Sequence, residues 1–465
     1  MRSSADFDVV VVGGTAGLAA ALAARCEGAS VALVEQQARL GGDCTFYGCV
    51  PSKVLIEVAQ LAHEARRAAA EGILAGVPEL EFAAIMRRLA RIVEAIARDE
   101  RDERFTRAGV EVVHGRARFL DEHALEVGER VLQGRRFVVA TGSLPAVPPI
   151  AGLAEVSFLT NRTIFGLERL PRRLVVLGGG AVGLELAQAF RRFGSEVTVV
   201  ELLERLLPRE EPEAGETIAQ VLREEGVGLR LGAEVESVER RNGQVVLHVA
   251  GGEVVCDALL VAAGRTGSVE GLGLELELDG GYVEVDDRCR TSLPHVYAAG
   301  DVTGGLQFTH VASHEGVVAG RNAAGTRARK SERVVPSVTF TDPEIARVGL
   351  TELEARERHG GVEVHVFPMS RVDRARILER PVGFVKLVTA RRPLLGRAGG
   401  GVLVGAQIVG PRAGELIQEC ALAIRTRCFA GRLAQTIHAY PTLSLAVQQA
   451  EAQISPLGRL LADAD

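Results

Sequence analysis

The chain has 465 residues, of which 47% are hydrophobic and 25% charged, a balance typical of a water-soluble globular protein with two to four domains. The formal net charge of −6 gives no basic surface for nucleic acid, and no apolar run reaches the roughly 20 residues of a membrane span. Seven cysteines are too sparse for a secreted disulfide framework, and the first residues leave no room for a signal peptide, so we expect a cytoplasmic protein.

The N-terminal segment has the pattern of a dinucleotide-binding β-α-β unit. A predicted apolar strand leads into a turn that contains Gly13, Gly14 and Gly17, and an alanine-rich helix and a second strand ending at Glu35 follow. Glycines let the backbone approach a pyrophosphate, and the acid is placed to bind a ribose hydroxyl. In a second β-α-β unit, described below, the first glycine of the turn lies 23 residues before the acid, Gly178 before Glu201. The same spacing counted back from Glu35 falls on Val12, so we expect Gly13 to absorb the strain of the turn.

Cys44 and Cys49 are separated by four residues in a segment framed by glycines. Pro51 and the apolar residues after it predict a helix that begins near Cys49, where the helix dipole and Lys53 favour a thiolate. A thiolate with a partner thiol in reach is what thiol–disulfide exchange requires. The alternatives are two structural cysteines or half of a zinc site, but no second ligand pair lies nearby, and we predict no metal site.

A second β-α-β unit follows with a complete Gly-x-Gly-x-x-Gly turn at Gly178, Gly180 and Gly183. Its second predicted strand ends at Glu201, close to the spacing expected for the acid that binds a ribose. Glu201 can accept from the 2′-hydroxyl of NAD and would repel the 2′-phosphate of NADP, although Arg205 nearby could weaken this preference. We therefore expect NAD(H) rather than NADP(H).

The run Gly-Gly-Asp-Cys-Thr-Phe-Tyr-Gly-Cys-Val-Pro-Ser-Lys resembles the active-site stretch of the pyridine nucleotide-disulfide oxidoreductases, and the resemblance extends from Phe7 to about Ala450. It implies FAD as a second cofactor and an ion pair of Lys53 with Glu185 beside the flavin, the alternative for Glu185 being an exposed helix acid. It also implies that Asp301 binds the FAD ribitol, unless this acid only caps the next helix. The flavin-facing positions implied by the resemblance are Gly13, Gly14, Gly17, Glu35, Gly42, Lys53, Thr141, Gly142, Gly264, Arg265, Gly300 and Asp301.

The resemblance implies an α/β fold with two Rossmann-like dinucleotide-binding domains and an α+β C-terminal dimerisation domain. The expected segments are an FAD-binding domain in two parts, 1–148 and 267–334, an NAD-binding domain, 149–266, and a dimerisation domain, 335–465. A homodimer is implied, in which the partner chain completes each active site. A helical stretch is predicted over about 81–107, because apolar residues recur there at spacings of three and four.

The C-terminal part departs from the members of the family that act on thiol substrates, which commonly read His-x-His-Pro-Thr-x-x-Glu. Here Tyr440 replaces the second histidine and Leu445 replaces the glutamate, while His438 remains at the first position. A tyrosine titrates near about 10 and is a poor base at neutral pH, but it can donate a hydrogen bond to a thiolate. In carrying a tyrosine at position 440, the chain resembles the mercuric reductase-like members of the family. Its tail, 454–465, lacks the cysteine pair that those enzymes carry at their C-terminus.

The sequence therefore predicts an enzyme that passes electrons from NADH through FAD to a Cys44–Cys49 disulfide. The resemblance implies that Cys49 faces the flavin and that Cys44 exchanges with the acceptor, a small molecule such as a disulfide, a quinone or a metal–thiol complex. One alternative is a reductase of the dihydrolipoamide dehydrogenase or glutathione reductase type. The other is a non-catalytic flavoprotein that senses redox state, against which the intact cysteine pair and glycine turn argue.

Overall fold

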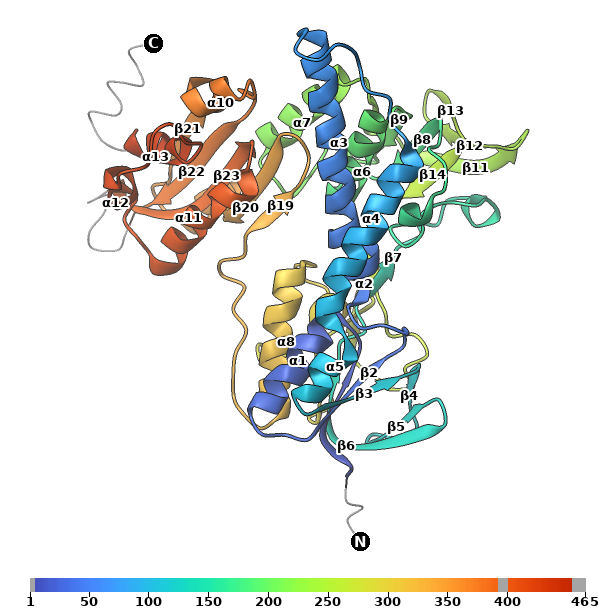
Figure 1. Cartoon of the computed structure of the whole chain (residues 1–465). Coiled ribbons are helices and arrows are strands. Elements are labelled where there is room, and N and C mark those ends of the chain that lie inside the picture. The colour runs from blue at the N-terminus through green and yellow to red at the C-terminus, as the bar shows by residue number, and fades with distance from the viewer. Residues whose placement is uncertain (1–4, 392–399, 454–465) are drawn as a thin grey trace.

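The computed structural model describes residues 5–391 and 400–453, so the cysteine-free tail lies outside the described residues. The first domain is built on a parallel sheet with an antiparallel extension (Figure 1). In spatial order its strands are β3 (Val110–His114), β2 (Val31–Glu35), β1 (Phe7–Val12), β6 (Arg130–Val139), β5 (Ala124–Val127) and β4 (Ala117–Phe119), with β18 (Val296–Ala298) also paired to β6. The valines of β1 and β2 are buried, as expected for a parallel sheet covered on both faces.

Two helices, α1 (Thr15–Cys26) and α8 (Thr309–Ala323), pack closely against each other beside this sheet (Figure 1). Two glycines of α8 allow the close approach, because a Cβ at Gly316 would lie 2.2 Å from the carbonyl oxygen of Ala16, and one at Gly320 2.1 Å from that of Ala20. This packing brings the N-terminus of α8 to the edge of the sheet where α1 also begins.

The predicted cysteine segment forms two consecutive helices, α2 (Gly42–Tyr47) and α3 (Cys49–Ala70), so Cys49 is the first residue of a 22-residue helix. The predicted helix over 81–107 is interrupted. It consists of α4 (Phe82–Ala97), a 3₁₀ turn (Arg98–Glu100) and α5 (Asp102–Arg107), because Arg101 has an extended backbone with ψ 153°. The interruption turns the chain back towards β3 and places Glu100 beside the cysteine segment.

The second domain has a four-stranded parallel sheet in the order β10 (Gly228–Arg230), β9 (Glu196–Val200), β8 (Arg173–Leu177) and β14 (Ala258–Val261). Helix α6 (Ala181–Phe193) lies under it, and α7 (Pro212–Glu224) packs alongside. A small antiparallel sheet, β11 (Val235–Arg241), β12 (Gln244–Val249) and β13 (Gly252–Cys256), is added to this domain.

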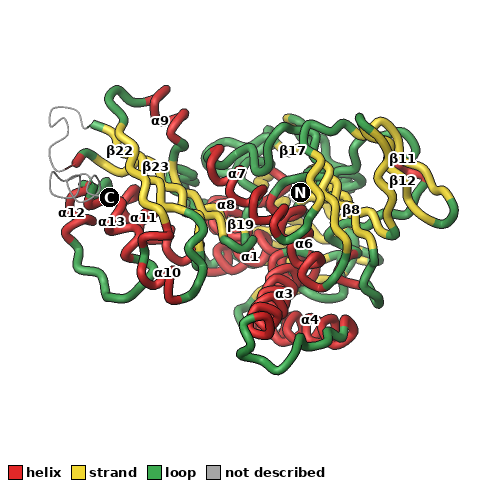
Figure 2. Tube along the Cα trace, turned by 90° about the horizontal axis from the view of Figure 1, so that it is seen from above, coloured by secondary structure: helices red, strands yellow, loops and turns green. Residues whose placement is uncertain are grey.

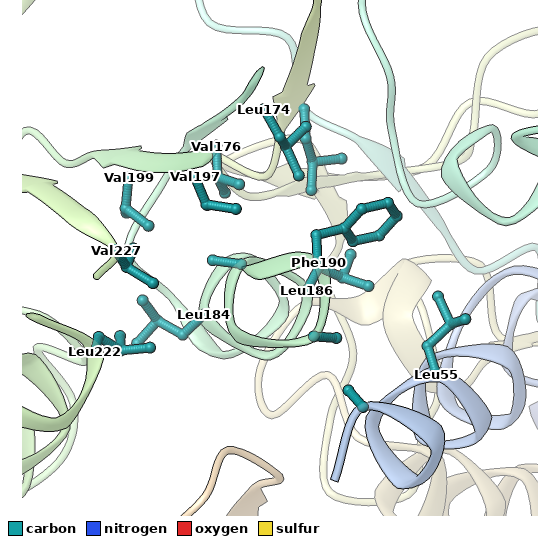
Figure 3. Packing of buried hydrophobic residues seen from close by; sticks show 14 of the residues in the cluster. Leu55, Leu174, Val176, Leu184, Leu186, Phe190, Val197, Val199, Leu222 and Val227 are labelled. Atoms are coloured by element: carbon teal, nitrogen blue, oxygen red, sulfur yellow. The ribbon is translucent and has the colours of Figure 1, made fainter. Parts of the chain in front are cut away.

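Figure 3 shows how α6 connects the two domains. Leu184, Leu186 and Phe190 of α6 are fully buried and belong to the same cluster as Leu174 and Val199 of the sheet above them. Leu55 of α3 is 0% exposed and joins this cluster from the other side of α6. The helix that carries Cys49 and Lys53 is therefore packed on the helix that carries Glu185.

The remaining short elements link the two domains and complete the first. Strands β7 (Ser143–Pro145) and β15 (Arg265–Gly267) pair antiparallel where the chain passes between the domains in both directions. The others are a two-stranded sheet of β16 (Leu278–Asp279) and β17 (Tyr282–Val283) and the 3₁₀ helices Leu153–Glu155, Ile164–Gly166 and Gly300–Thr303.

The C-terminal domain lies to one side of the other two (Figures 1 and 2). Its antiparallel sheet has the order β19 (Ser337–Thr339), β20 (Glu344–Gly349), β23 (Val402–Gly410), β22 (Phe384–Ala390) and β21 (Glu363–Pro368). Its helices are α9 (Glu352–Arg358), α10 (Asp373–Ile377), α11 (Ala413–Thr426), α12 (Ala430–Gln435) and α13 (Leu445–Ala452), with a 3₁₀ turn at Met369–Arg371. Of the helices that the structure describes, none has the length and apolar character to cross a membrane.

Candidate active site

A cavity of about 850 Å³ runs along the C-terminal ends of β1 and β2 to the two cysteines. Its walls come from the glycine turn of the first unit, the cysteine helices, the N-terminus of α8 and the helix α6 of the second domain. Of the flavin-facing positions named above, all except Gly17, Gly264 and Gly300 line this cavity. The structure thus brings together residues that are up to 288 positions apart in the chain, from Gly13 to Asp301.

The glycine turn of the first unit is one residue shorter than that of the second. Gly13 and Gly178 have φ values of +113° and +118°, and each amide donates a hydrogen bond of 2.9 Å to the carbonyl oxygen of the residue before the acid of its unit, Val34 or Val200. A Cβ at Gly13 would lie 2.1 Å from the Ala140 oxygen, which only glycine avoids. Val12 is a buried residue of β1, so assigning it to the first glycine position is wrong by one residue, and Gly13 makes the turn.

Three buried polar atoms of cavity-lining residues have no hydrogen-bond partner among the described residues, Glu35 Oε2, Thr141 Oγ1 and Arg162 Nε, and the first two lie beside the glycine turn. The other carboxylate oxygen of Glu35 accepts 2.9 Å from the Gln37 amide, and burial raises the pKa of this acid. Buried polar groups normally have partners, so an unpaired acceptor and an unpaired hydroxyl indicate a ligand with hydroxyl groups. Together with Gly14, whose added Cβ would come within 2.8 Å of Gly42 Cα, these residues fit the adenosine part and the pyrophosphate of FAD.

Further along the cavity, Asp301 accepts 2.7 Å from the Ser143 hydroxyl and lies 3.6 Å from the guanidinium of Arg265. Asp301 is the second residue of the 3₁₀ turn Gly300–Thr303, and the next helix, α8, follows Phe308 and has no side-chain cap, so the alternative role of Asp301 as a helix cap is not observed. Arg265 also binds Asp43 at 2.8 Å, and Arg162 binds the second carboxylate oxygen of Asp43 at the same distance. These two arginines tie the residue before Cys44 to the segments that enter and leave the second domain.

The two cysteines are free thiols whose sulfur atoms share one neighbour, Thr309. The Thr309 hydroxyl lies 3.1 Å from Cys44 Sγ and 3.2 Å from Cys49 Sγ, within hydrogen-bonding range of both sulfurs. Hydrogen bonding to Cys44 and Thr309 and the charge of Lys53 lower the pKa of Cys49 to about 6, against the effect of burial. The pKa of Cys44 is raised, first by hydrogen bonding to Cys49 and then by burial. The directions of the two pKa shifts therefore favour a thiolate on Cys49 rather than on Cys44.

Lys53 forms the expected ion pair with Glu185, at 2.9 Å from Oε2. The Glu185 side chain is 4% exposed, and its other oxygen accepts 2.8 Å from the Phe340 amide of the C-terminal domain. Lys53 Nζ also lies 4.5 Å from the centre of the Phe340 ring, a cation–π distance. The alternative in which Glu185 is an exposed surface acid is therefore excluded.

Thr45, Phe46 and Tyr47, which lie between the two cysteines, join α2 to neighbouring segments. Thr45 donates 2.7 Å to Glu100, Phe46 lies under the guanidinium of Arg39, and the Tyr47 carbonyl accepts 2.9 Å from Asn161. Sequence reasoning missed these contacts and that of Thr309. Glu100, Asn161 and Thr309 belong to no recognisable motif and are distant from the cysteine segment in the chain.

In the second unit, the carboxylate of Glu201 lies over the glycine turn. One oxygen accepts 2.5 Å from the Gly179 amide and the other accepts 2.8 Å from the Leu203 amide. Arg205 donates instead to the carbonyl oxygens of Pro208 and Glu210, so its guanidinium is held by backbone groups. The acid at the end of β9 is therefore the charged group at the turn that begins with Gly178.

Tyr440 and His438 lie in the C-terminal domain, and neither lines the cavity of the same chain. Tyr440 is 72% exposed and donates 3.0 Å to Asp373, an interaction that raises the pKa of the phenol. The His438 side chain is 7% exposed, with Nε2 at 3.0 Å from Glu419 and Nδ1 at 2.9 Å from the Thr436 carbonyl. Leu445 is the first residue of α13.

One group of carboxylates in the described residues has the spacing of a metal site, Glu211, Glu213 and Glu352. The ammonium group of Lys386 lies among them, at 2.9, 2.8 and 3.0 Å from their oxygens. The ammonium group of Lys386 therefore already forms ion pairs with all three carboxylates.

Comparison with known proteins gives two family matches that together cover most of the chain. Residues 7–316 match the family described as "Pyridine nucleotide-disulphide oxidoreductase", and residues 335–451 match its dimerisation domain. The chain is 38% identical to a mercuric reductase of Shigella flexneri, over 95% of this chain and 79% of that protein. It is 37% identical to a dihydrolipoyl dehydrogenase of Thermus scotoductus, over 96% of both chains.

Among solved structures, a Cu(II) complex of the HOCl-induced flavoprotein disulfide reductase RclA from Escherichia coli is similar. Its TM-score is 0.84, with 28% identity over 94% of this chain and 98% of the other. The fold and the presence of a dimerisation domain are thus shared with flavoprotein disulfide reductases.

Proposed function

Because the chain belongs to the pyridine nucleotide-disulphide oxidoreductase family, whose members use FAD and NAD(P)H, we propose that it carries electrons from NADH through FAD to the Cys44–Cys49 pair. The acceptor that we propose is a metal–thiol complex, a quinone or a disulfide. The observation that carries the proposal is the sulfur pair itself, because the thiolate-forming Cys49 and its partner border the cavity whose unpaired Glu35 and Thr141 fit FAD.

FAD, when bound, supplies the group that takes a hydride from NADH and passes two electrons to a disulfide. Glu35 and Thr141 would hold it at one end and Asp301 at the other, since all three line the cavity. Lys53, fixed by Glu185, places a positive charge beside Cys49. Two electrons and one proton convert the Cys44–Cys49 disulfide to one thiol and one thiolate. The directions of the two pKa shifts favour the thiol on Cys44 and the thiolate on Cys49.

We propose NADH as the donor. The support is the position of Glu201 over the second glycine turn and the engagement of Arg205 with backbone carbonyls, which holds that guanidinium away from a 2′-phosphate.

We propose that the acceptor side resembles that of mercuric reductases. Tyr440 in place of a histidine and Leu445 in place of a glutamate remove the acid–base pair used on thiol substrates. A relative named mercuric reductase and a structural neighbour solved as a Cu(II) complex make Hg(II) and Cu(II) bound to thiols suitable test acceptors.

We also propose a homodimer, in which Tyr440 of the partner subunit stands near Cys44. The support is that Val338 is the only residue after 335 among the described residues that line the cavity, while Tyr440 is exposed in the single chain. A cytoplasmic location fits this proposal, since a reducing compartment keeps the other cysteines as thiols.

The second candidate is a dihydrolipoamide dehydrogenase or glutathione reductase activity. One observation favours it, the His438–Glu419 contact at 3.0 Å, because an imidazole oriented by a carboxylate is the usual proton carrier of such enzymes. Both nitrogens of His438 are engaged in this structure, which makes it the weaker candidate.

A steady-state screen distinguishes the candidates. NADH oxidation is measured with lipoamide, glutathione disulfide, a quinone, and Hg(II) or Cu(II) in excess thiol, for the wild type and for Cys44→Ser. The proposal predicts turnover of a metal–thiol complex or a quinone that depends on Cys44 and exceeds turnover of either disulfide. Rapid Cys44-dependent turnover of lipoamide or glutathione disulfide would instead select the second candidate.

A further inference from the structure

The proposed electron path assigns no role to the hydroxyl of Thr309, although this group lies between the two sulfur atoms. It is the first residue of α8, and α3 begins at Cys49, so the N-termini of two long helices meet at the sulfur pair. The hydroxyl lies 3.1 Å from Cys44 Sγ and 3.2 Å from Cys49 Sγ. These distances are within hydrogen-bonding range for sulfur, so one hydroxyl bridges the two reacting atoms.

A threonine hydroxyl has one proton to donate and two lone pairs to accept. Between a thiol and a thiolate it can donate to the thiolate while accepting from the thiol, but it cannot donate to both sulfurs at once. The other charged groups that face the pair are Lys53 from α3, Glu185 from α6 and Glu100 from the 3₁₀ turn after α4. Among the described residues, none of these three hydrogen-bonds to either sulfur.

We propose that Thr309 sets which sulfur of the reduced pair carries the negative charge. With the hydroxyl directed to Cys49, the charge stays on the sulfur at the FAD cavity. When the hydroxyl turns to Cys44, the proton of the Cys44 thiol moves to Cys49, and the charge appears on the sulfur that meets the acceptor. One proton changes place and no electron is transferred. The role of Cys44 in meeting the acceptor rests on the proposed function.

The arrangement matters here because Tyr440 and Leu445 replace the acid–base pair that would otherwise take the Cys44 proton. A proton exchanged within the pair needs no such base. Cys44 also borders a second, smaller cavity of about 250 Å³, which is lined by Thr309 and, one turn further along α8, by Ser313. The Thr309 hydroxyl therefore lies where Cys44 borders this smaller cavity as well as the large one.

The test uses the purified holoenzyme after chemical reduction with a phosphine, so that the dithiol forms whether or not NADH reduces it. Alkylation of Cys44 and of Cys49 by iodoacetamide is followed against pH by peptide mass spectrometry. The variants are Thr309→Val, which keeps the shape without the hydroxyl, Thr309→Ser, which keeps the hydroxyl, and Ser313→Ala as the matched control one turn away.

We expect Thr309→Val to shift the pH profile of Cys49 alkylation upward by about one pH unit. This shift corresponds to a tenfold loss of thiolate at pH values where the rate still rises with pH. Alkylation of Cys44 should become slower as well. Thr309→Ser should return both profiles towards wild type, and Ser313→Ala should leave them unchanged. Profiles of Thr309→Val that coincide with wild type would overturn the proposal. So would a Thr309→Ser profile displaced as far as that of valine, since packing would then be the cause. If the valine variant does not fold, Thr309→Ala takes its place with the same expectations.

The outcome is separable from that of the proposed function. A protein whose cysteines are not reduced by NADH would refute the electron path, while the alkylation profiles of the chemically reduced protein would still decide the role of Thr309.

Discussion

The ammonium group of Lys53 lies 2.9 Å from the carboxylate of Glu185, and this contact joins the cysteine helix of one domain to the first helix of the other. Glu185 also accepts a hydrogen bond from the Phe340 amide, so the ion pair is held by three parts of the chain. The charge beside Cys49 is therefore fixed in position by the packing of α3 on α6 (Figure 3).

Removing the lysine charge should make the Cys49 thiolate less stable. Lys53→Met is expected to raise the pKa of Cys49 above about 6, because the lysine charge is one of the causes of its low value. It also leaves Glu185 buried without its cation, which should lower the free energy of unfolding by about 1–3 kcal/mol. Alkylation against pH and urea unfolding measure the two effects. Lys53→Arg is the control, and a Lys53→Met profile equal to wild type would contradict this role.

The stability of the reduced protein should depend on pH through Cys49. Its folded pKa, about 6, lies below the ordinary value of 9.0, so the folded state is increasingly favoured as pH rises from 6 to 9, and this gain is lost as pH falls through 6. The raised pKa of Cys44 acts in the opposite sense only above 9.0. Urea unfolding of the phosphine-reduced protein, compared with Cys49→Ser over this range, isolates the effect. Parallel curves for the two proteins would show that Cys49 is not a stabilised thiolate.

Glu201 should control the choice of nicotinamide donor. We expect wild-type kcat/KM to be higher for NADH than for NADPH, because a carboxylate at the ribose repels a 2′-phosphate. Glu201→Ser should lower kcat/KM for NADH by about tenfold and move the NADH/NADPH ratio towards NADPH. Arg205→Ala serves as the control and should leave the ratio unchanged. A wild type that prefers NADPH would contradict the assignment.

The missing acid–base pair should limit reduction of disulfides. General acid–base catalysis contributes about 10²–10⁴-fold, which is the deficit expected with lipoamide or glutathione disulfide. Tyr440→His alone should recover little, whereas Tyr440→His combined with Leu445→Glu should recover more than the two single changes together. The measurement is a double-mutant cycle with FAD content checked in each variant. If the unmodified protein reduced these disulfides at ordinary enzyme rates, Tyr440 or His438 would be the proton carrier, and this prediction would be contradicted.

Glu451 should destabilise the folded protein at neutral pH. It is 0% exposed in the core of the C-terminal domain, neither oxygen has a hydrogen-bond partner in the described residues, and burial raises its pKa to about 9. Because this folded pKa lies above the ordinary 4.5, stability is lost as pH rises from 4.5 towards 9. Glu451→Met should increase the free energy of unfolding by about 1–3 kcal/mol at pH 7 and flatten the pH dependence. A less stable Glu451→Met variant would mean that a partner subunit satisfies the acid.

The glycine turns, the cysteine pair and the Lys53–Glu185 contact could be predicted from the sequence, because each belongs to a motif with a fixed spacing or to a family resemblance. The count that placed the first glycine at Val12 failed because the turn is one residue shorter than its counterpart, which no spacing rule shows. Thr309 could not be predicted, since it meets Cys49 only through the packing of α8 on α1, 260 positions later in the chain.

The same limit applies to Asp43, whose bonds to Arg162 and Arg265 depend on how the two domains meet. It applies equally to His438, whose partner Glu419 comes from α11 and belongs to no motif that the sequence shows. Helix periodicity gave the apolar stripe of α4 but not its end at Ala97, because the extended Arg101 is set by the return of the chain to the sheet.

The account rests on the transfer of electrons from NADH to Cys44 and Cys49, and counting thiols tests it most directly. The oxidised holoenzyme is denatured in N-ethylmaleimide before and after anaerobic addition of one equivalent of NADH, and each cysteine is located by peptide mass spectrometry. We predict that Cys44 and Cys49 are unlabelled before the addition and fully labelled after it, while the other five cysteines do not change. Labelling of Cys44 and Cys49 that is the same with and without NADH, in a protein that has bound FAD, would contradict the account.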